Sequence, residues 1–216
     1  MKQLNAIADA FGFLKFNQTN SVVQKRVAFA IDYSGSMSGE KIRSAVENLQ
    51  MLFDNNISVG DSIMLLHFTE KILIDFDLTV KSAANSDFFR SKIQALVYPS
   101  GSTAFYDAVN TALSKFKARP SDMDWIVALT DGDDNSSNIT KDNLINYLSS
   151  AHSGLGIIII GVGNDVNTEI LTSIVKSRSQ KGIYVSANGD KKSINEAFLK
   201  VSEIIIQGNV LLEESF

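Results

Sequence analysis

The sequence contains no cysteine and only two histidines among its 216 residues. The absence of cysteine excludes disulfide bonds, zinc sites built on thiolates and cysteine nucleophiles together. It also favours a reducing compartment, so we expect a cytoplasmic location. His67 and His152 have no partner that the sequence reveals. A Ser-His-Asp catalytic triad is therefore not expected.

Long runs of one kind of side chain are also missing. No stretch of five or more basic residues occurs, and the formal net charge of −4 gives no general attraction for nucleic acid or anionic lipid. The longest apolar run, 154–163, has about half the length that a membrane-spanning helix needs. The first residues lack the uninterrupted apolar core and the cleavage site of a secretory signal. We therefore predict neither nucleic-acid binding nor membrane insertion.

The chain does contain short apolar runs that alternate with stretches of helical period. Runs typical of strands lie at 27–31, 61–68, 71–78, 124–130, 155–162 and 182–187. Amphipathic stretches that predict helices lie at 40–56, 84–97, 103–117, 140–152, 167–178 and 191–207. The second and third runs are so close that only a hairpin can join them, so one of these two strands runs antiparallel. The pattern predicts an α/β fold with a mostly parallel six-stranded sheet and helices on both faces.

One domain accounts for the patterned part of the chain. Residues 24–207 contain all the predicted strands and helices, and 216 residues with 44% hydrophobic side chains suffice for a single α/β core. Residues 1–23 form an N-terminal extension that could add a helix, and residues 208–216 form a C-terminal tail.

Two aspartates, Asp32 and Asp131, come directly after apolar runs. In largely parallel sheets, ligands bind beyond the carboxyl ends of the strands, so both carboxylates should lie at the same rim. Ser34 and Ser36 follow the first aspartate at alternate positions, where a non-helical loop can turn all three side chains toward one point. A small hard cation such as Mg²⁺ prefers such oxygen ligands.

Three segments together resemble the metal-ion-dependent adhesion site of the von Willebrand factor A domain family. They are IDYSGSMSG (31–39), PSGSTAFYDA (99–108) and ALTDGDDN (128–135). The resemblance covers roughly residues 24–207 and implies a Rossmann-like, three-layer αβα fold with one antiparallel edge strand. It also implies a metal site for Mg²⁺, with Mn²⁺ and Ca²⁺ as alternatives. The implied metal ligands are Asp32, Ser34, Ser36, Thr103 and Asp131.

The serines also suit a structural role. Ser34, Ser36 and Ser38 can act as turn residues or helix N-caps, and we expect Ser38 to cap the helix that follows. From the first aspartate and its serines alone, a metal site and a structural turn are equally supported. Thr103, in a loop ahead of a helix, and Asp131 add oxygens from two further loops and favour the metal site.

The resemblance implies a protein-interaction module and not an enzyme. The bound metal would accept a glutamate or aspartate from a partner protein, and Tyr33 and Tyr106 are candidates for contact with that partner. The family also suggests two states linked to a shift of the last helix, 191–207. We assign Asp107 to the start of its helix, and Asp133 and Asp134 to the neighbouring loop, where either could add charge near the metal.

Two other functions stay open from the sequence. A magnesium-dependent hydrolase or phosphatase on a related sheet could use Asp32 as nucleophile, but such enzymes usually need a second carboxylate two residues on, where this chain has Ser34. A scaffold with a vestigial metal site could instead bind through its helix faces. The segment 131–142 lacks the glycine and glutamate of a calcium loop, and no complete phosphate loop or G-x-S-x-G motif occurs.

Overall fold

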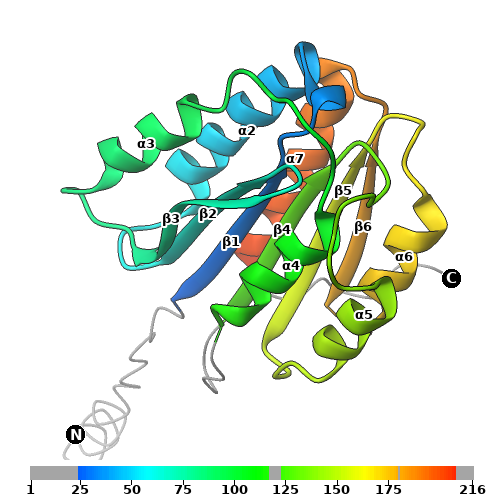
Figure 1. Ribbon diagram of the computed structural model, residues 1–216. Helices are drawn as coiled ribbons and strands as arrows, with labels where there is room; N and C mark the ends of the chain where they lie inside the picture. The colour runs from blue at the N-terminus through cyan, green and yellow to red at the C-terminus, as the bar shows by residue number, and fades with distance from the viewer. Residues whose placement is uncertain (1–23, 117–122, 180, 208–216) are drawn as a thin grey trace, which may run out of the picture.

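The computed structural model describes residues 24–116, 123–179 and 181–207 (Figure 1). The predicted N-terminal extension, 1–23, and the predicted C-terminal tail, 208–216, lie outside the described residues. No helix in the described ranges is long and apolar enough to cross a bilayer.

Six strands form one mixed sheet, as the apolar runs predict. They are β1 (Lys25–Asp32), β2 (Ser62–Phe68), β3 (Ile72–Val80), β4 (Met123–Thr130), β5 (Leu155–Val162) and β6 (Gly182–Ala187). The strand order is β3-β2-β1-β4-β5-β6, and only the β2–β3 pair is antiparallel. The prediction of a mostly parallel sheet with one antiparallel edge strand is confirmed.

Helices cover both faces of the sheet (Figure 1). One face carries α2 (Glu40–Asn56), α3 (Ser86–Gln94) and α7 (Lys191–Gln207), and the other carries α4 (Phe105–Ser114), α5 (Lys141–Ser149) and α6 (Thr168–Lys176). A short 3₁₀ turn, η1 (Gly35–Met37), lies between β1 and α2. The predicted three-layer αβα architecture is confirmed, although α3, α4, α5 and α6 are a few residues shorter than their periodic patterns.

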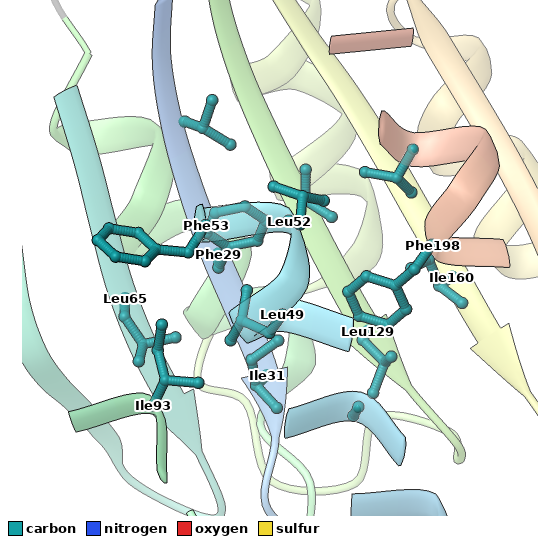
Figure 2. Packing of buried hydrophobic residues seen from close by; sticks show 14 of the residues in the cluster. Phe29, Ile31, Leu49, Leu52, Phe53, Leu65, Ile93, Leu129, Ile160 and Phe198 are labelled. Carbon is teal, nitrogen blue, oxygen red and sulfur yellow. The ribbon is translucent and has the colours of Figure 1, made fainter. Parts of the chain in front are cut away.

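The alternation of side chains along β1 divides the core in two. Phe29 and Ile31 point toward α2, where Phe53 packs, whereas Ala28 and Ala30 face α4 (Figure 2). All five of these side chains are buried. Because consecutive residues of a strand point to opposite faces, a continuous apolar run such as 27–31 serves both layers at once.

A close approach between two central strands gives the first testable prediction. A Cβ added to Gly156 in β5 would lie only 2.3 Å from Cζ3 of the fully buried Trp125 in β4. We expect Gly156→Ala to lower the free energy of unfolding by about 2 kcal/mol or more, because the surrounding core is already filled. Urea unfolding measures the change. Gly132→Ala is the control, since an added Cβ there meets nothing within 4 Å, and an equal loss in both variants would contradict the prediction.

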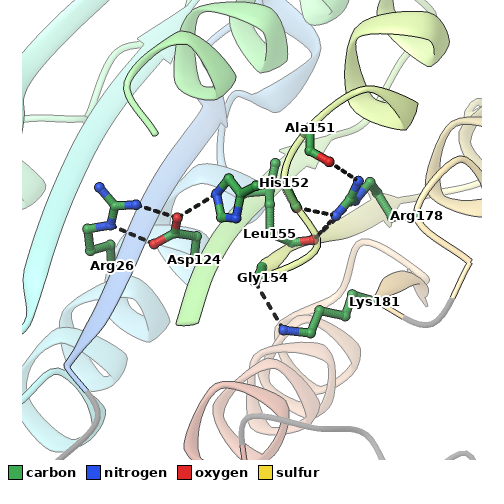
Figure 3. A network of polar contacts seen from close by, with 8 residues as sticks. All are labelled: Arg26, Asp124, Ala151, His152, Gly154, Leu155, Arg178 and Lys181. Carbon is green, nitrogen blue, oxygen red and sulfur yellow. Dashed lines mark hydrogen bonds and ion pairs between the residues drawn. The ribbon is translucent and has the colours of Figure 1, made fainter. Parts of the chain in front are cut away.

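Buried charges lie at the amino ends of the parallel strands (Figure 3). Arg26 Nε donates to Asp124 Oδ1 at 2.6 Å, its Nη2 bonds Asp124 Oδ2, and His152 Nε2 lies 2.8 Å from the same Oδ2. His152, for which the sequence revealed no partner, therefore contacts a carboxylate. Nearby, Arg178 donates to the carbonyl oxygens of Leu148, Ala151, His152 and Leu155. These contacts tie the end of α5, the following turn and the start of β5 to the segment that follows α6.

Candidate functional site

The candidate site lies where the strand order reverses. The chain passes from β1 outward to β2 on one side, whereas β4 leads to β5 on the other, so the two central strands diverge in their connections. Ligands of open α/β sheets bind in the crevice at this point. In the β1–β4 register, Ile31 pairs with Leu129, which places Asp32 and Asp131 just beyond the last pair at the same rim.

Asp32 is completely buried and bonded through both carboxylate oxygens. Oδ1 accepts the Ser34 backbone N–H at 2.9 Å, and Oδ2 accepts the Thr130 hydroxyl at 2.6 Å. Burial raises the pKa of the Asp32 carboxyl; the hydrogen bonds from Thr130 and Ser34 oppose this effect, and the nearby Asp131 adds to it. A cation at this rim would therefore stabilise the charged form of Asp32.

Asp131 is the second buried carboxylate of the candidate site. It joins β4 to the loop that follows β1, which we call the first loop. Its Oδ1 accepts the Ser36 hydroxyl at 2.7 Å, and its Oδ2 accepts Lys41 Nζ at 2.6 Å. Ser34 Oγ lies 3.1 Å from Ser36 Oγ. Four of the five predicted site residues, including Asp32 through its bond with Ser34, thus form one connected hydrogen-bonded cluster.

Thr103 reaches this cluster through its backbone. Its N–H donates to Asn135 Oδ1 at 2.9 Å, and two residues earlier the Gly101 carbonyl accepts the Gly35 N–H at 3.1 Å. The Thr103 side chain is different: the residue is 4% exposed, yet its hydroxyl has no hydrogen-bond partner in the described part of the chain. The structure therefore places the three loops together, and the Thr103 hydroxyl, which is not fully enclosed, stays available as the predicted ligand.

Tyr33 clamps the first loop to the loop before α4. Its backbone carbonyl accepts the Ser100 N–H at 2.9 Å, and its phenol oxygen accepts the Tyr98 N–H at 2.8 Å. Its ring packs edge-on against His67, with the ring centroids 4.9 Å apart. Tyr33 is therefore half-buried, and its bonds give it a structural role. Contact of Tyr33 and Tyr106 with a partner protein stays a prediction.

A family model described as von Willebrand factor type A domain matches residues 27–198. The chain belongs to this family. A von Willebrand factor A domain-containing protein of Dictyostelium discoideum is 27% identical over 186 residues, which are 83% of this chain and 21% of that protein. This A domain therefore spans about a fifth of the length of that relative. The family is one of protein-interaction and adhesion modules.

Solved structures share the fold. A von Willebrand factor type A structure from Catenulispora acidiphila has a TM-score of 0.71 at 20% identity and covers 85% of this chain and 43% of its own. The proximal thread matrix protein 1 of the mussel byssus, described with a zinc-occupied MIDAS motif, has a TM-score of 0.63 at 21% identity, covering 86% and 45%. At these identities the similarity shows the fold alone.

The donor set of this A domain suits a hard divalent cation. Among residues 24–116, 123–179 and 181–207, no group of three or more His, Asp or Glu side chains could hold a metal by itself. An ion at the rim would therefore combine the Asp32 and Asp131 carboxylates with neutral hydroxyls. Oxygen-only donor sets of this kind fit Mg²⁺, which also retains some of its water.

One sequence-based prediction near the site is wrong. Ser38 does not cap α2; the N-cap is Gly39, whose φ of +86° suits glycine and which has no side chain to form a capping hydrogen bond. The Ser38 hydroxyl instead points to the Pro99 carbonyl at 3.4 Å. The predicted position of Asp107 in the first turn of α4 is confirmed, and its carboxylate accepts the backbone N–H groups of Asn138 and Ile139.

The other acidic residues of the β4 loop brace that loop. Asp134 accepts the Tyr106 N–H at 2.9 Å, and Asp133 accepts the Asn167 N–H at 3.0 Å. Burial, followed by the charges of these two aspartates, raises the pKa of the Tyr106 phenol. Asp133 and Asp134 thus stabilise the loop that follows β4, which is the role expected for them from the sequence.

Three residues of the site were not identified from the sequence: Lys41, Thr130 and Asn135. Thr130 and Asn135 flank the recognised aspartate in the β4 loop, and each bonds a residue of another loop. Lys41 could have been noticed, because a cation in the first turn of a helix is unfavourable with respect to the helix dipole. Such a placement indicates that an acidic side chain lies nearby.

Proposed function

We propose that this A domain binds a partner protein through Mg²⁺. The ion would be held, in part through water, by Asp32, Ser34, Ser36, Thr103 and Asp131. Mn²⁺ and Ca²⁺ offer the same preference for oxygen ligands and are the alternatives. A glutamate or aspartate of the partner would complete the coordination.

The observation that carries the proposal is the convergence of three loops on two buried carboxylates. The bond between Ser36 and Asp131 joins the first loop to the β4 loop, and the Thr103 N–H bond joins the third loop to the same segment. Only two of the five proposed ligands are anionic, and they would act in part through water, so the ion would stay electron-poor at its open position. An ion in that state favours a further carboxylate, which the solvent-facing side of the rim would admit.

The family supports the proposal at a coarser level. Protein interaction is the common property of these modules, and the zinc in the MIDAS motif of the mussel matrix protein shows that this fold can hold a divalent ion. The identity of the metal in the present chain rests on its own donor set.

Metal-dependent capture of a partner tests this function. The bead-bound chain is expected to retain a protein from extract in Mg²⁺ and to release it in EDTA. Ser36→Ala should abolish retention because it removes a ligand and the bond to Asp131. Ser38→Ala is the matched control, since the one hydrogen bond of this exposed hydroxyl within the described residues goes to the Pro99 carbonyl. Retention that survives in both variants, or in EDTA, would contradict the proposal and would favour a scaffold that binds through its helix faces.

One observation favours a second candidate, a magnesium-dependent phosphatase. Such enzymes need a lysine near the nucleophilic aspartate, and Lys41 Nζ lies at this rim. However, Lys41 bonds Asp131 and not Asp32, and Ser34 stands where a second carboxylate would be needed. Turnover of p-nitrophenyl phosphate with Mg²⁺, lost in Asp32→Asn, would favour the enzyme; we expect no turnover above the buffer rate.

A further inference from the structure

Lys41, which bonds Asp131, is the one basic side chain bonded to either rim carboxylate in the described part of the chain. It is the second residue of α2, and its Nζ lies 2.6 Å from Asp131 Oδ2. The Asp131 side chain is fully buried, whereas that of Lys41 is 26% exposed. The ammonium group therefore partly neutralises the cluster from its solvent side.

The Lys41 side chain lies close to two glycine turns. A Cβ on Gly163 would lie 3.8 Å from Lys41 Nζ, and one on Gly189 would lie 3.5 Å from Lys41 Cε. Both glycines have φ near +90°, and the Gly163 N–H bonds the Ala187 carbonyl at 2.7 Å, which holds the two turns together. The lysine thus passes along two backbone turns, after β5 and after β6, to reach a strand end of β4.

The helix itself gives no reason for a lysine at this position. The first turn of a helix carries a partial positive charge, so an acidic residue such as Glu40 is favoured there and a basic one is disfavoured. The bond to Asp131 is the interaction that compensates for this unfavourable placement.

We propose that Lys41 is an internal cation that competes with the divalent metal for Asp131. This inference rests on the proposed metal site. Without metal, the ammonium offsets one of the two buried carboxylate charges and stabilises the closed cluster. With metal, the ammonium and the ion repel each other, so Lys41 lowers the metal affinity.

The same charge favours the partner's carboxylate. Two aspartates and a divalent ion alone sum to a neutral site, whereas Lys41 leaves the loaded site with one net positive charge. A carboxylate that approaches from outside then meets a cationic rim. Lys41 would in this way lower the affinity for the metal and raise the affinity of the metal-bound site for an acidic ligand.

Metal titration of the Lys41→Met variant tests this inference. Isothermal titration with Mg²⁺ and Mn²⁺ on the full chain is expected to show at least tenfold tighter binding by Lys41→Met than by the unaltered protein. In EDTA the variant should melt at a lower temperature, because two buried carboxylates then lack their counter-charge. Lys192→Met is the control, since that side chain is 86% exposed in α7 and should change neither quantity.

A carboxylate probe tests the second half of the inference. Acetate, titrated into the Mn²⁺-loaded chain and followed by water proton relaxation, is expected to bind several-fold more weakly to Lys41→Met. If that variant folds poorly without metal, Lys41→Gln keeps a polar end in the same place and removes the same charge.

The outcomes separate the two proposals. Equal or weaker metal binding by the neutral variants would overturn the competition and make Lys41 a group that only positions Asp131. Binding by the variants but not by the unaltered chain would support the competition and overturn metal-dependent function in the native sequence. Binding by neither would overturn the metal site and the inference with it.

Discussion

Asp131→Ala is expected to remove the rise in melting temperature that Mg²⁺ gives the unaltered chain. A ligand that binds only the native state stabilises it by about 2.7 kcal/mol at a hundred times its dissociation constant. For a chain of this size, that corresponds to about 5–10 °C. The variant lacks one of the two proposed anionic ligands and the acceptor of the Ser36 hydroxyl, so the response should vanish.

Differential scanning fluorimetry with Mg²⁺ and with EDTA measures this response. Asp133→Ala is the matched control, because Asp133 lies two residues further along the same loop and bonds only the Asn167 backbone in the described chain. That control should keep the full rise on adding Mg²⁺. A rise that persists in Asp131→Ala would show that the ion binds elsewhere.

Asp124→Asn should produce the largest loss of stability among single changes of charge. The Asp124 side chain is fully buried and bonds Arg26 through both oxygens, with His152 beside it (Figure 3). Removing its charge breaks both contacts between Asp124 and the buried Arg26, and the disruption of a buried ion pair costs about 3–5 kcal/mol. Urea unfolding should therefore show a markedly lower midpoint, at an unchanged slope.

Two further variants test the cause of this loss. Asp87→Asn is the surface control, because its side chain is 95% exposed and its pair with Arg90 should be worth little. The double variant Arg26→Met with Asp124→Leu should recover most of the loss, since it replaces both charges of the buried pair by apolar side chains. A double variant as unstable as Asp124→Asn would show that the carboxylate has another essential role.

The strands and the rim were predictable because local patterns determine them. The run 155–162 coincides with β5, and the topological rule alone brought Asp32 and Asp131 to one edge. In both cases the relevant information, an apolar run and the residue that follows it, lies within a few positions of sequence.

The polar contacts were not predictable because they join distant residues through flexible side chains. Arg26 and Asp124 are 98 positions apart, and Lys41 reaches Asp131 across 90. Each pair depends on the register of β1 with β4 and on the path of α2, which no short segment specifies. Ser38 failed for another reason: two adjacent residues could each cap the helix, and the left-handed turn selected Gly39.

The bonds of Tyr33 have a consequence for the thermodynamics of ligand capture. Through its phenol and its carbonyl, this residue fastens 98–100 to the segment that carries Ser34 and Ser36. Loops that are already immobilised lose little conformational entropy when they take a ligand. Tyr33→Phe would remove the hydrogen bond between the phenol oxygen and the Tyr98 N–H. We therefore expect a larger entropic penalty on complex formation, with the enthalpy of coordination nearly unchanged.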